Sequence, residues 1–459
     1  MAGGAAKLGE QVAARLESVI RSNAWPAGHY LGHEEQLSRD FGTSRSVIRE
    51  AIAIAEWNGV VESRRGREGG LYVRERALDP AIALLRNYLF LSGADLPSLL
   101  RARRLIEGRI LELATERIEA DDAAGLAGLL ADPASPRDDR VHLSRLKQIV
   151  DRMSELADAP LLRLFGGALR HCYVDRVRTT TLDDGAYLRA SRAVAKCRML
   201  QIQAILDYDR GAVRDLQTRA MDIWEAFAAE LSPARLSGAA IVDRLTATGN
   251  GALIYEFVQP AKKAEAVARA IAQMIANRSL DVGERLGTEA ELLADFGVSR
   301  RVFREGVRIL ERFGIVEPGR GKLGGLMVGS PRRDMLIASL GGNVPALAET
   351  AVRDDGLLPM LLTDAVRALV AQDECRRDAF VRAVGAAQPP SASGLARLVA
   401  IHAPDALTGC LIEITLDCGR RSDEGRLDRR QLSALLNAIG SADRFAAPRM
   451  LRGLCPPAA

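Results

Sequence analysis

The stretch "DFGTSRSVIRE" at residues 40–50 returns as "DFGVSRRVFRE" at residues 295–305, 255 positions further along the chain. The match continues on both sides at this offset, and it needs no insertion or deletion across about sixty residues. Glycines recur with it, since Gly42 returns as Gly297. Two segments that repeat each other over this length are expected to share one fold.

Each copy predicts a winged helix-turn-helix. Its first helix is amphipathic, because Val12 and Leu16, like Val267 and Ile271, stand at helical spacing. A short second helix and a tight glycine turn lead to a third helix, for which a serine is the expected N-cap. The predicted strand pairs are "VVES" with "LYV" in the first copy and "IVEP" with "LMV" in the second. The loops "RRGREGG" and "GRGKLGG" between them form the wings.

Both copies resemble the DNA-binding domain of the GntR family of bacterial regulators. The family pattern runs roughly "LPSERELA…GVSRTPVREAL…G…GxG", and the resemblance covers residues 8–76 and 260–329. One such match would be weak, but the ordered set of helix, turn, "SR…RE" and wing occurs twice here. The resemblance implies two DNA-binding domains in one cytoplasmic transcriptional regulator. Its implied partner is double-stranded DNA, and repression is expected by analogy with the family.

Residues at the start of a helix that enters the major groove lie near base edges. An arginine there can pair with guanine or with phosphate, and two arginines at i and i+4 project from one face. A solvated helix face with internal ion pairs is the ordinary alternative. The expected DNA-binding residues lie at the start of each third helix and in each wing: Ser44, Arg45, Ser46, Arg49, Arg64, Arg65, Gly66, Arg67, Ser299, Arg300, Arg301, Arg304, Arg320, Gly321 and Lys322.

The net charge of the whole chain is only +4, so an anion-binding surface has to be local. Between residues 299 and 333, nine basic residues stand against three acidic ones, where the predicted fold would meet DNA. One position departs from the family pattern. The arginine that follows the "LPSE" glutamate is replaced by Glu35 in the first copy and by Ala290 in the second. A DNA contact of the family is therefore expected to be missing from both copies.

The remaining sequence predicts helices, so the expected fold class is mainly α, with each winged helix-turn-helix followed by an α-helical bundle region. Residues 80–232 are similar to the all-helical effector domain of the FadR subfamily, often called the FCD domain, through "DLPSLLRARRLIEGRILELATERIEADDAAGL", "ELADAPLLRLF" and "QAILDYDRGAV". The similarity implies a region that binds a small-molecule effector, forms a dimer, or does both. Residues 233–259 are expected to form a connector, and residues 330–459 a helical C-terminal region that fits a degenerate effector domain.

Many members of the subfamily hold a metal in this domain through one aspartate and three histidines. Alignment with the family landmarks places Val150, Arg198 and about Ala220 at the histidine positions. None of these side chains ligates a divalent metal in the usual way, so no metal and no cofactor is expected. Arg198 is a candidate partner for the acid group of an organic effector, although an arginine on a helix is usually solvated.

The composition argues against other classes of protein. Residues are 48% hydrophobic and 27% charged, as in ordinary soluble proteins, and no apolar run of about 18 residues predicts a membrane span. The six cysteines are scattered without C-x-x-C spacing, which favours a reducing compartment over disulfides or zinc. The sequence has no nucleotide loop, metal cluster or nucleophile motif, so neither catalytic residues nor enzymatic activity is expected.

Two function hypotheses follow. The intact "SR…RE" helices favour a sequence-specific regulator, and the missing arginines favour a helical interaction or architectural protein with non-specific DNA or protein binding. The two copies also differ, since Ser46 corresponds to Arg301 and Ile48 corresponds to Phe303. We therefore expect one chain to read an imperfect inverted repeat with unequal halves. A homodimer of chains is a second arrangement that the sequence allows.

Overall fold

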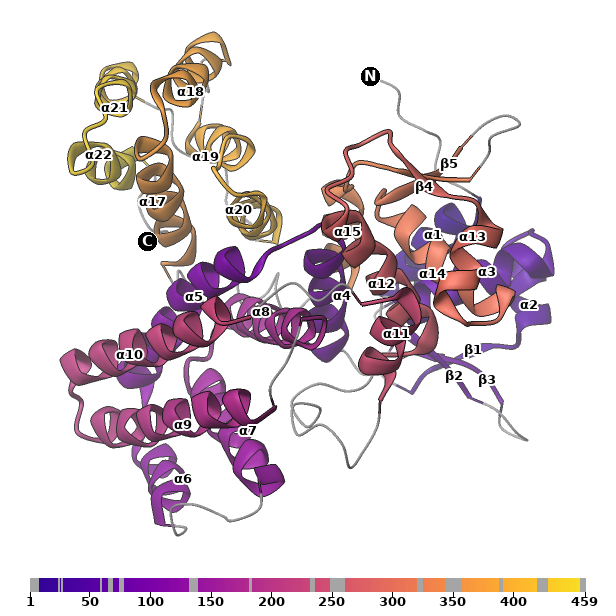
Figure 1. Ribbon diagram of the computed structural model, residues 1–459, viewed down its shortest axis with the longest axis horizontal. Coiled ribbons are helices and arrows are strands. Elements are labelled where there is room, and N and C mark those ends of the chain that lie inside the picture. The colour runs from indigo at the N-terminus through magenta and orange to yellow at the C-terminus, as the bar shows by residue number, and fades with distance from the viewer. Residues whose placement is uncertain are drawn as a thin grey trace.

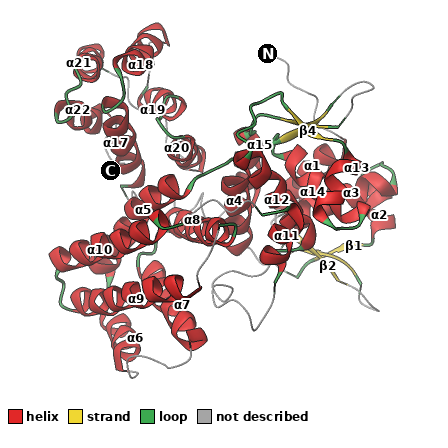
Figure 2. Cartoon of the chain, in the orientation of Figure 1, coloured by secondary structure: helices red, strands yellow, loops and turns green. Residues whose placement is uncertain are grey.

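Helices dominate the computed structural model, which describes residues 8–454 apart from 24, 26–27, 58–59, 65–68, 74–77, 132–138, 181–183, 232–235, 248–260, 320–324, 344–355, 388–390 and 419–427. Within the described residues, six short strands form two small sheets and the other regular elements are helices (Figure 2). The prediction of a mainly α fold is confirmed.

The two repeated segments fold into equivalent units, which we call the first head and the second head. The first head contains α1 (Leu8–Ser22), β1 (Tyr30–Gly32), α2 (Glu34–Asp40), α3 (Arg45–Trp57), β2 (Val61–Arg64) and β3 (Gly70–Val73). The second head contains α12 (Lys263–Asn277), β4 (Arg285–Gly287), α13 (Glu289–Phe296), α14 (Arg300–Arg312), β5 (Val316–Pro318) and β6 (Leu326–Val328). Both heads therefore have the helix and strand order of a winged helix-turn-helix.

The sheets of the two heads agree in strand order and in register. β3 lies between β1 and β2, and β6 lies between β4 and β5, with antiparallel pairing. Val61 pairs with Val73, and Val316 pairs with Val328, which is the same register at the offset of 255. The strand pairs predicted from the sequence are present. The sequence does not predict β1 and β4, because three residues carry too little alternation to be recognised.

Local sequence explains how the last two helices of each head are joined. Gly42 and Gly297 have left-handed backbone, with φ of 62° and 60°, which residues with a side chain rarely adopt. Thr288 completes a capping box at the start of α13, whereas the His33 side chain makes no cap bond at the start of α2. Ser299 caps α14 through its side chain. The third helices therefore begin where the sequence predicts them.

A bundle of seven helices follows the first head: α4 (Leu78–Leu91), α5 (Leu96–Arg117), α6 (Ala120–Ala131), α7 (Asp139–Leu156), α8 (Pro160–Arg178), α9 (Asp184–Leu206) and α10 (Arg210–Ala229). α8 packs against both α4 and α5 and is buried over most of its length. Gly166 and Gly167 allow this close packing, since a Cβ at Gly167 would lie 2.9 Å from Cδ1 of Ile82. Residues of α8 therefore face several partners at once.

One further helix, α11 (Gly238–Thr246), lies within residues 233–259, where the sequence predicts a connector. Ser237 caps this helix, which packs against α12 and α13 of the second head. Gly238 is required at the contact, because a Cβ there would lie 2.5 Å from the ring of Phe296. α11 is thus an addition to the second head that the sequence repeat does not reveal.

The C-terminal region is helical throughout its described residues. It contains α15 (Arg333–Asn343), α17 (Leu357–Val370), α18 (Glu374–Ala387), α19 (Ala392–Ile401), α20 (Ala406–Cys418), α21 (Arg429–Gly440) and α22 (Ala446–Leu454). α17 packs against α20 and α22, and both α17 and α20 contact α5 of the bundle (Figure 1). An ion pair of 3.0 Å between Arg101 and Asp405 adds to this contact.

The two heads differ in how they are attached. Buried apolar residues of the first head, among them Leu16, Ile48 and Val61, form a separate core. Those of the second head, such as Ile271 and Phe303, belong to a core that continues into α4, α8 and the C-terminal helices. The second head is therefore part of the body of the molecule, and the first head has a core of its own.

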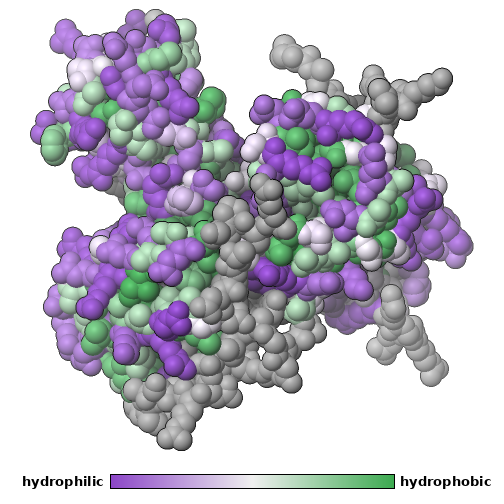
Figure 3. All heavy atoms as spheres, in the orientation of Figure 1, coloured by the Kyte–Doolittle hydropathy of each residue, from purple (hydrophilic) through white to green (hydrophobic). Residues whose placement is uncertain are grey.

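The surface is mixed in character. On the face shown in Figure 3, hydrophobic residues form small patches between hydrophilic ones. Among the helices of the described residues, none is long and apolar enough to cross a membrane.

Candidate nucleic-acid interface

The start of each third helix presents its arginines to solvent. Arg45 and Arg49 of α3 have side chains that are 61% and 66% exposed. In α14, the side chains of Arg300, Arg301 and Arg304 are 70%, 88% and 60% exposed. Ser44, Ser46 and Ser299 are exposed beside them. The structure thus brings the predicted residues of each third helix together on one accessible end of that helix.

Acidic residues of the preceding helix hold these arginines in the first head. Glu35 of α2 lies 2.5 Å from Arg45, and Glu34 lies 2.6 Å from Arg49. Such pairing across two helices is not the i, i+4 pairing that the sequence offers as the ordinary alternative. Both carboxylates lie at the candidate interface although the sequence did not predict them as site residues. The only sign of them in the sequence was that Glu35 replaces an arginine of the family pattern.

The second head uses one carboxylate for two arginines. Glu289 of α13 accepts a hydrogen bond from Arg304 at 3.0 Å, and its carboxylate lies 3.3 Å from the Arg300 guanidinium. Arg301 forms an i, i+4 pair with Glu305 at 3.1 Å, so this part of the ordinary alternative does occur. All of these pairs are largely exposed, and exposed ion pairs contribute only about 0–1 kcal/mol each. DNA phosphates can therefore compete for the arginines.

Ile48 and Phe303 take no part in this surface. Their side chains are 0% and 1% exposed and belong to the cores of the heads. The expectation that this pair of positions distinguishes two DNA readers is therefore wrong, because a buried side chain cannot reach a base edge. The difference between the exposed Ser46 and the exposed Arg301 remains.

Most of each wing lies outside the described residues, including the predicted positions Arg65, Gly66, Arg67, Arg320, Gly321 and Lys322. Arg64 is described at the end of β2. It pairs with Glu62 at 2.7 Å, and its guanidinium lies 4.3 Å from the ring centroid of Tyr72. Cation–π contact and ion pair together hold Arg64 against the sheet.

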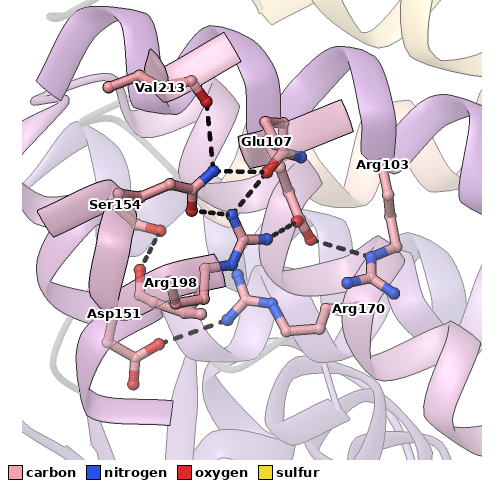
Figure 4. Close-up of polar contacts among 10 residues, drawn as sticks. Arg103, Glu107, Asp151, Ser154, Arg170, Arg198 and Val213 are labelled. Atoms are coloured by element: carbon pink, nitrogen blue, oxygen red, sulfur yellow. Dashed lines mark hydrogen bonds and ion pairs between the residues drawn. The ribbon is translucent and has the colours of Figure 1, made fainter. Parts of the chain in front are cut away.

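Arg198, the candidate effector residue, is buried in the bundle, so the expectation of a solvated side chain is wrong. It donates to Glu107 at 2.7 Å, to Gln201 at 2.8 Å and to Gln217 at 2.6 Å (Figure 4). Burial by itself raises the pKa of Glu107, but Arg103 and Arg198 outweigh it and lower the pKa to about 2. The carboxylate is therefore charged at neutral pH and is already shared by two guanidinium groups.

The cavity beside this cluster is small. Its volume is about 40 Å³, and its walls include Val150, Arg170, Tyr173 and Arg198. Val150 and Arg198 occupy positions that the family resemblance assigns to metal-ligating histidines, so an isopropyl group and a guanidinium stand where imidazoles would be needed. A cationic wall repels a metal ion, so the residues present do not fit the metal that the subfamily implies.

Asp175 of α8 joins the bundle to the second head. It accepts from Arg86 of α4 at 2.6 Å and lies 3.1 Å from Arg269 of α12 and 3.8 Å from Arg178. Burial by itself raises the pKa of Asp175, but Arg269 and Arg86 outweigh it and lower the pKa to about 2. One buried carboxylate therefore holds guanidinium groups from three helices together.

A larger cleft opens beside this junction. It has a volume of about 640 Å³ and lies between α5, α8 and α10 of the bundle and α12 of the second head. Arg176 donates to Gln273 at 2.8 Å, and Thr179 donates to the same oxygen at 3.2 Å, so the wall itself is a contact between bundle and head. Leu96 and Leu100 contribute apolar surface.

Comparison with known families finds one match in each head. Residues 8–73 and residues 263–322 both match the family described as "Bacterial regulatory proteins, gntR family". Each matched segment falls within one of the two heads of the structure, and the second match ends before β6.

Curated relatives resemble only part of the chain. The HTH-type transcriptional regulator LutR of Bacillus subtilis is 33% identical over 104 residues, which is 22% of this chain and 47% of LutR. The Exu regulon transcriptional regulator of Escherichia coli is 32% identical over 123 residues, 27% of this chain and 46% of that protein. The chain thus spans less than half the length of these relatives.

Solved structures also align with part of the chain. Streptococcus agalactiae GntR is 24% identical and covers 48% of this chain and 98% of its own, with a TM-score of 0.28. Escherichia coli McbR/YncC is 17% identical and covers 49% of this chain and 98% of its own, with a TM-score of 0.24.

Proposed function

We propose that this chain, whose two heads both match the gntR family of bacterial regulatory proteins, regulates transcription by placing the two heads on one DNA duplex. The observation that carries this proposal is the presence of two units with the helix and strand order of a winged helix-turn-helix and with exposed arginines at the start of both third helices. Repression is the proposed direction, by analogy with the family. The proposed interface consists of these helix starts and the two wings.

Covalent linkage supports the use of both heads on one duplex. Tethering raises the local concentration of the second head once the first is bound, so two weak contacts become one stronger one. Since Ser46 and Arg301 differ in length and charge, the heads prefer different contacts at this position. We therefore propose an imperfect inverted repeat as the operator.

Salt dependence tests this function against the alternative of non-specific binding. Duplexes are selected from a random pool with the full chain, and their affinity is compared with that of unselected DNA from 50 to 200 mM salt. A regulator is expected to bind selected DNA about 10³-fold or more tightly than unselected DNA. Equal affinity for both sets of duplexes, with equal salt slopes, would instead identify an architectural protein.

The wings are expected to act through phosphate. Replacing Arg65, Arg67, Arg320 and Lys322 by glutamine should flatten the slope of log K against log salt by up to about 3.6, since each phosphate contact contributes about 0.9. The matched control removes four exposed arginines from the bundle (Arg189, Arg192, Arg214 and Arg219). A slope that changes equally in both variants, or in neither, would place the wings away from DNA.

A small organic effector is the further part of the proposed function, and we place it in the cleft beside Gln273. Ligand sites usually measure about 300–1,000 Å³, and the cleft has about 640 Å³. The cavity beside Arg198 has about 40 Å³, and the Arg198 guanidinium already donates to Glu107. A ligand in the cleft would contact the bundle and the second head together, so it can change how the head is held.

Filling the cleft should abolish effector binding. Ala228 of α10 lines it and is half-buried, so Ala228→Trp places a large side chain in the space. Metabolites that raise the melting temperature of the wild-type chain are expected to lose this effect in the variant. A compound that stabilises Ala228→Trp as much as the wild type binds elsewhere and contradicts the assignment.

A further inference from the structure

The helices that precede the two recognition helices differ at one exposed position. Glu35 of α2 lies 2.5 Å from Arg45, and the equivalent residue of α13 is Ala290, which is also exposed. Arg300, the counterpart of Arg45, lies 3.3 Å from Glu289, and Glu289 also accepts a hydrogen bond from Arg304 at 3.0 Å. Arg45 is therefore paired with a carboxylate of its own, whereas Arg300 shares one.

The charge of the two helix-turn-helix segments differs in the same direction. Residues 34–57 contain three arginines and five acidic residues, for a net charge of −2. The equivalent residues 289–312 contain five arginines and five acidic residues, for a net charge of 0. The first head therefore presents a less favourable local field to a polyanion.

We propose that Glu35 is a specificity-determining residue that competes with DNA for Arg45, so that the second head engages DNA first and the first head reads the weaker half-site. This inference rests on the proposed function, because it concerns how the same two heads divide the work of binding. It assigns a role to a residue that contributes no attractive contact with phosphate.

The competition follows from the position of the carboxylate. For the Arg45 guanidinium to reach a base or a phosphate, it has to leave Glu35 or share its donors with it. A freed Glu35 carboxylate then stands close to the phosphates that Arg45 approaches, and like charges repel. Both side chains are 61% exposed, so solvent and salt weaken the effect. DNA can displace Glu35, at a cost in affinity.

Exchanging the two residues tests the inference. Glu35→Ala is expected to raise affinity for a selected duplex by about two- to fivefold at 50 mM salt, and to strengthen protection of the first head's half-site. Ala290→Glu should lower affinity by a similar factor and weaken protection of the other half-site. Both gains and losses should shrink at 200 mM salt, because they are electrostatic.

Glu35→Gln separates charge from structure. Glutamine keeps the length of the side chain and removes its charge, so it should act like Glu35→Ala if the carboxylate competes with DNA. A glutamine variant that behaves like the wild type would show that shape, and not charge, matters at this position, and would overturn the inference.

The inference and the proposed function fail in different ways. Unchanged or reduced affinity in Glu35→Ala, with selective binding of the wild-type chain intact, overturns the role of Glu35 and leaves the regulator in place. If the wild-type chain enriches no sequence from the random pool, the proposed function fails, and the role of Glu35 fails with it.

Discussion

Replacing Asp175 by asparagine is expected to lower the free energy of unfolding by about 3–5 kcal/mol, the usual cost of removing one partner from a buried ion cluster. Asp175 is fully buried, and the variant would leave Arg86, Arg178 and Arg269 without their shared carboxylate. Because Arg269 belongs to α12, the loss should also loosen the second head from the bundle. Chemical denaturation measures the effect.

An exposed aspartate of the same bundle provides the control. Asp215 of α10 is exposed, so Asp215→Asn should change stability by less than about 0.5 kcal/mol. If Asp175→Asn fails to fold, Arg269→Met offers a milder test, since it leaves Asp175 paired with Arg86. Equal stability of Asp175→Asn and Asp215→Asn would show that the cluster does not hold the head.

The same effect has a definite pH dependence. The pKa of Asp175 is lowered to about 2 in the folded protein, below the ordinary value of about 3.9 in the unfolded chain. Its stabilising contribution is therefore complete above about pH 4 and is lost as the pH falls toward 2. The stability difference between wild type and Asp175→Asn should narrow over that range.

Replacing Arg300 by alanine is expected to weaken specific DNA binding by about 1–3 kcal/mol, or about 5- to 150-fold, if its guanidinium contacts a base edge. Its side chain is 70% exposed at the start of α14, where a recognition helix meets bases. Arg45→Ala should act in the same direction at the other half-site. Its effect should be the smaller one, because Glu35 already occupies Arg45.

Removing one positive charge from the bundle controls for the effect of the protein's overall charge on DNA binding. Arg214 of α10 is exposed and lies outside both heads, so Arg214→Ala should leave affinity for the selected duplex nearly unchanged. Titrations at fixed salt compare the three variants. Wild-type affinity in both Arg45→Ala and Arg300→Ala, with intact folding, would remove the third helices from the DNA interface.

The sequence predicts the heads well because their signals are local. Amphipathic spacing in α1 and α12, the serine at the start of α14 and the glycines at 42 and 297 each fix the backbone within a few residues. α11 has such signals too, with Ser237 as its cap, but it lies among prolines and glycines that favour a linker. The strands β1 and β4 have only three residues each, so their sequences show no alternation of hydrophobic and polar residues that would predict a strand.

The sequence does not predict the interactions between helices. The buried Arg198 pairs with Glu107, which lies 91 residues earlier, and Asp175 pairs with Arg269, which lies 94 residues later. Neither spacing follows a helical or strand period, so nothing in the sequence marks these pairs. The sequence shows that Glu35 departs from the family pattern. Its contact with Arg45 depends on how α2 and α3 pack against each other, which only the structure shows.

In the proposed complex, one chain places two unequal heads on one duplex. The most direct test is the stoichiometry and footprint of the complex with a selected duplex, determined by native mass spectrometry and by nuclease or radical protection. We expect one chain per duplex and two protected segments of different sequence, one weakened by Arg45→Ala and the other by Arg300→Ala. Two chains on a perfectly symmetric operator, with both segments equally sensitive to both substitutions, would contradict the account.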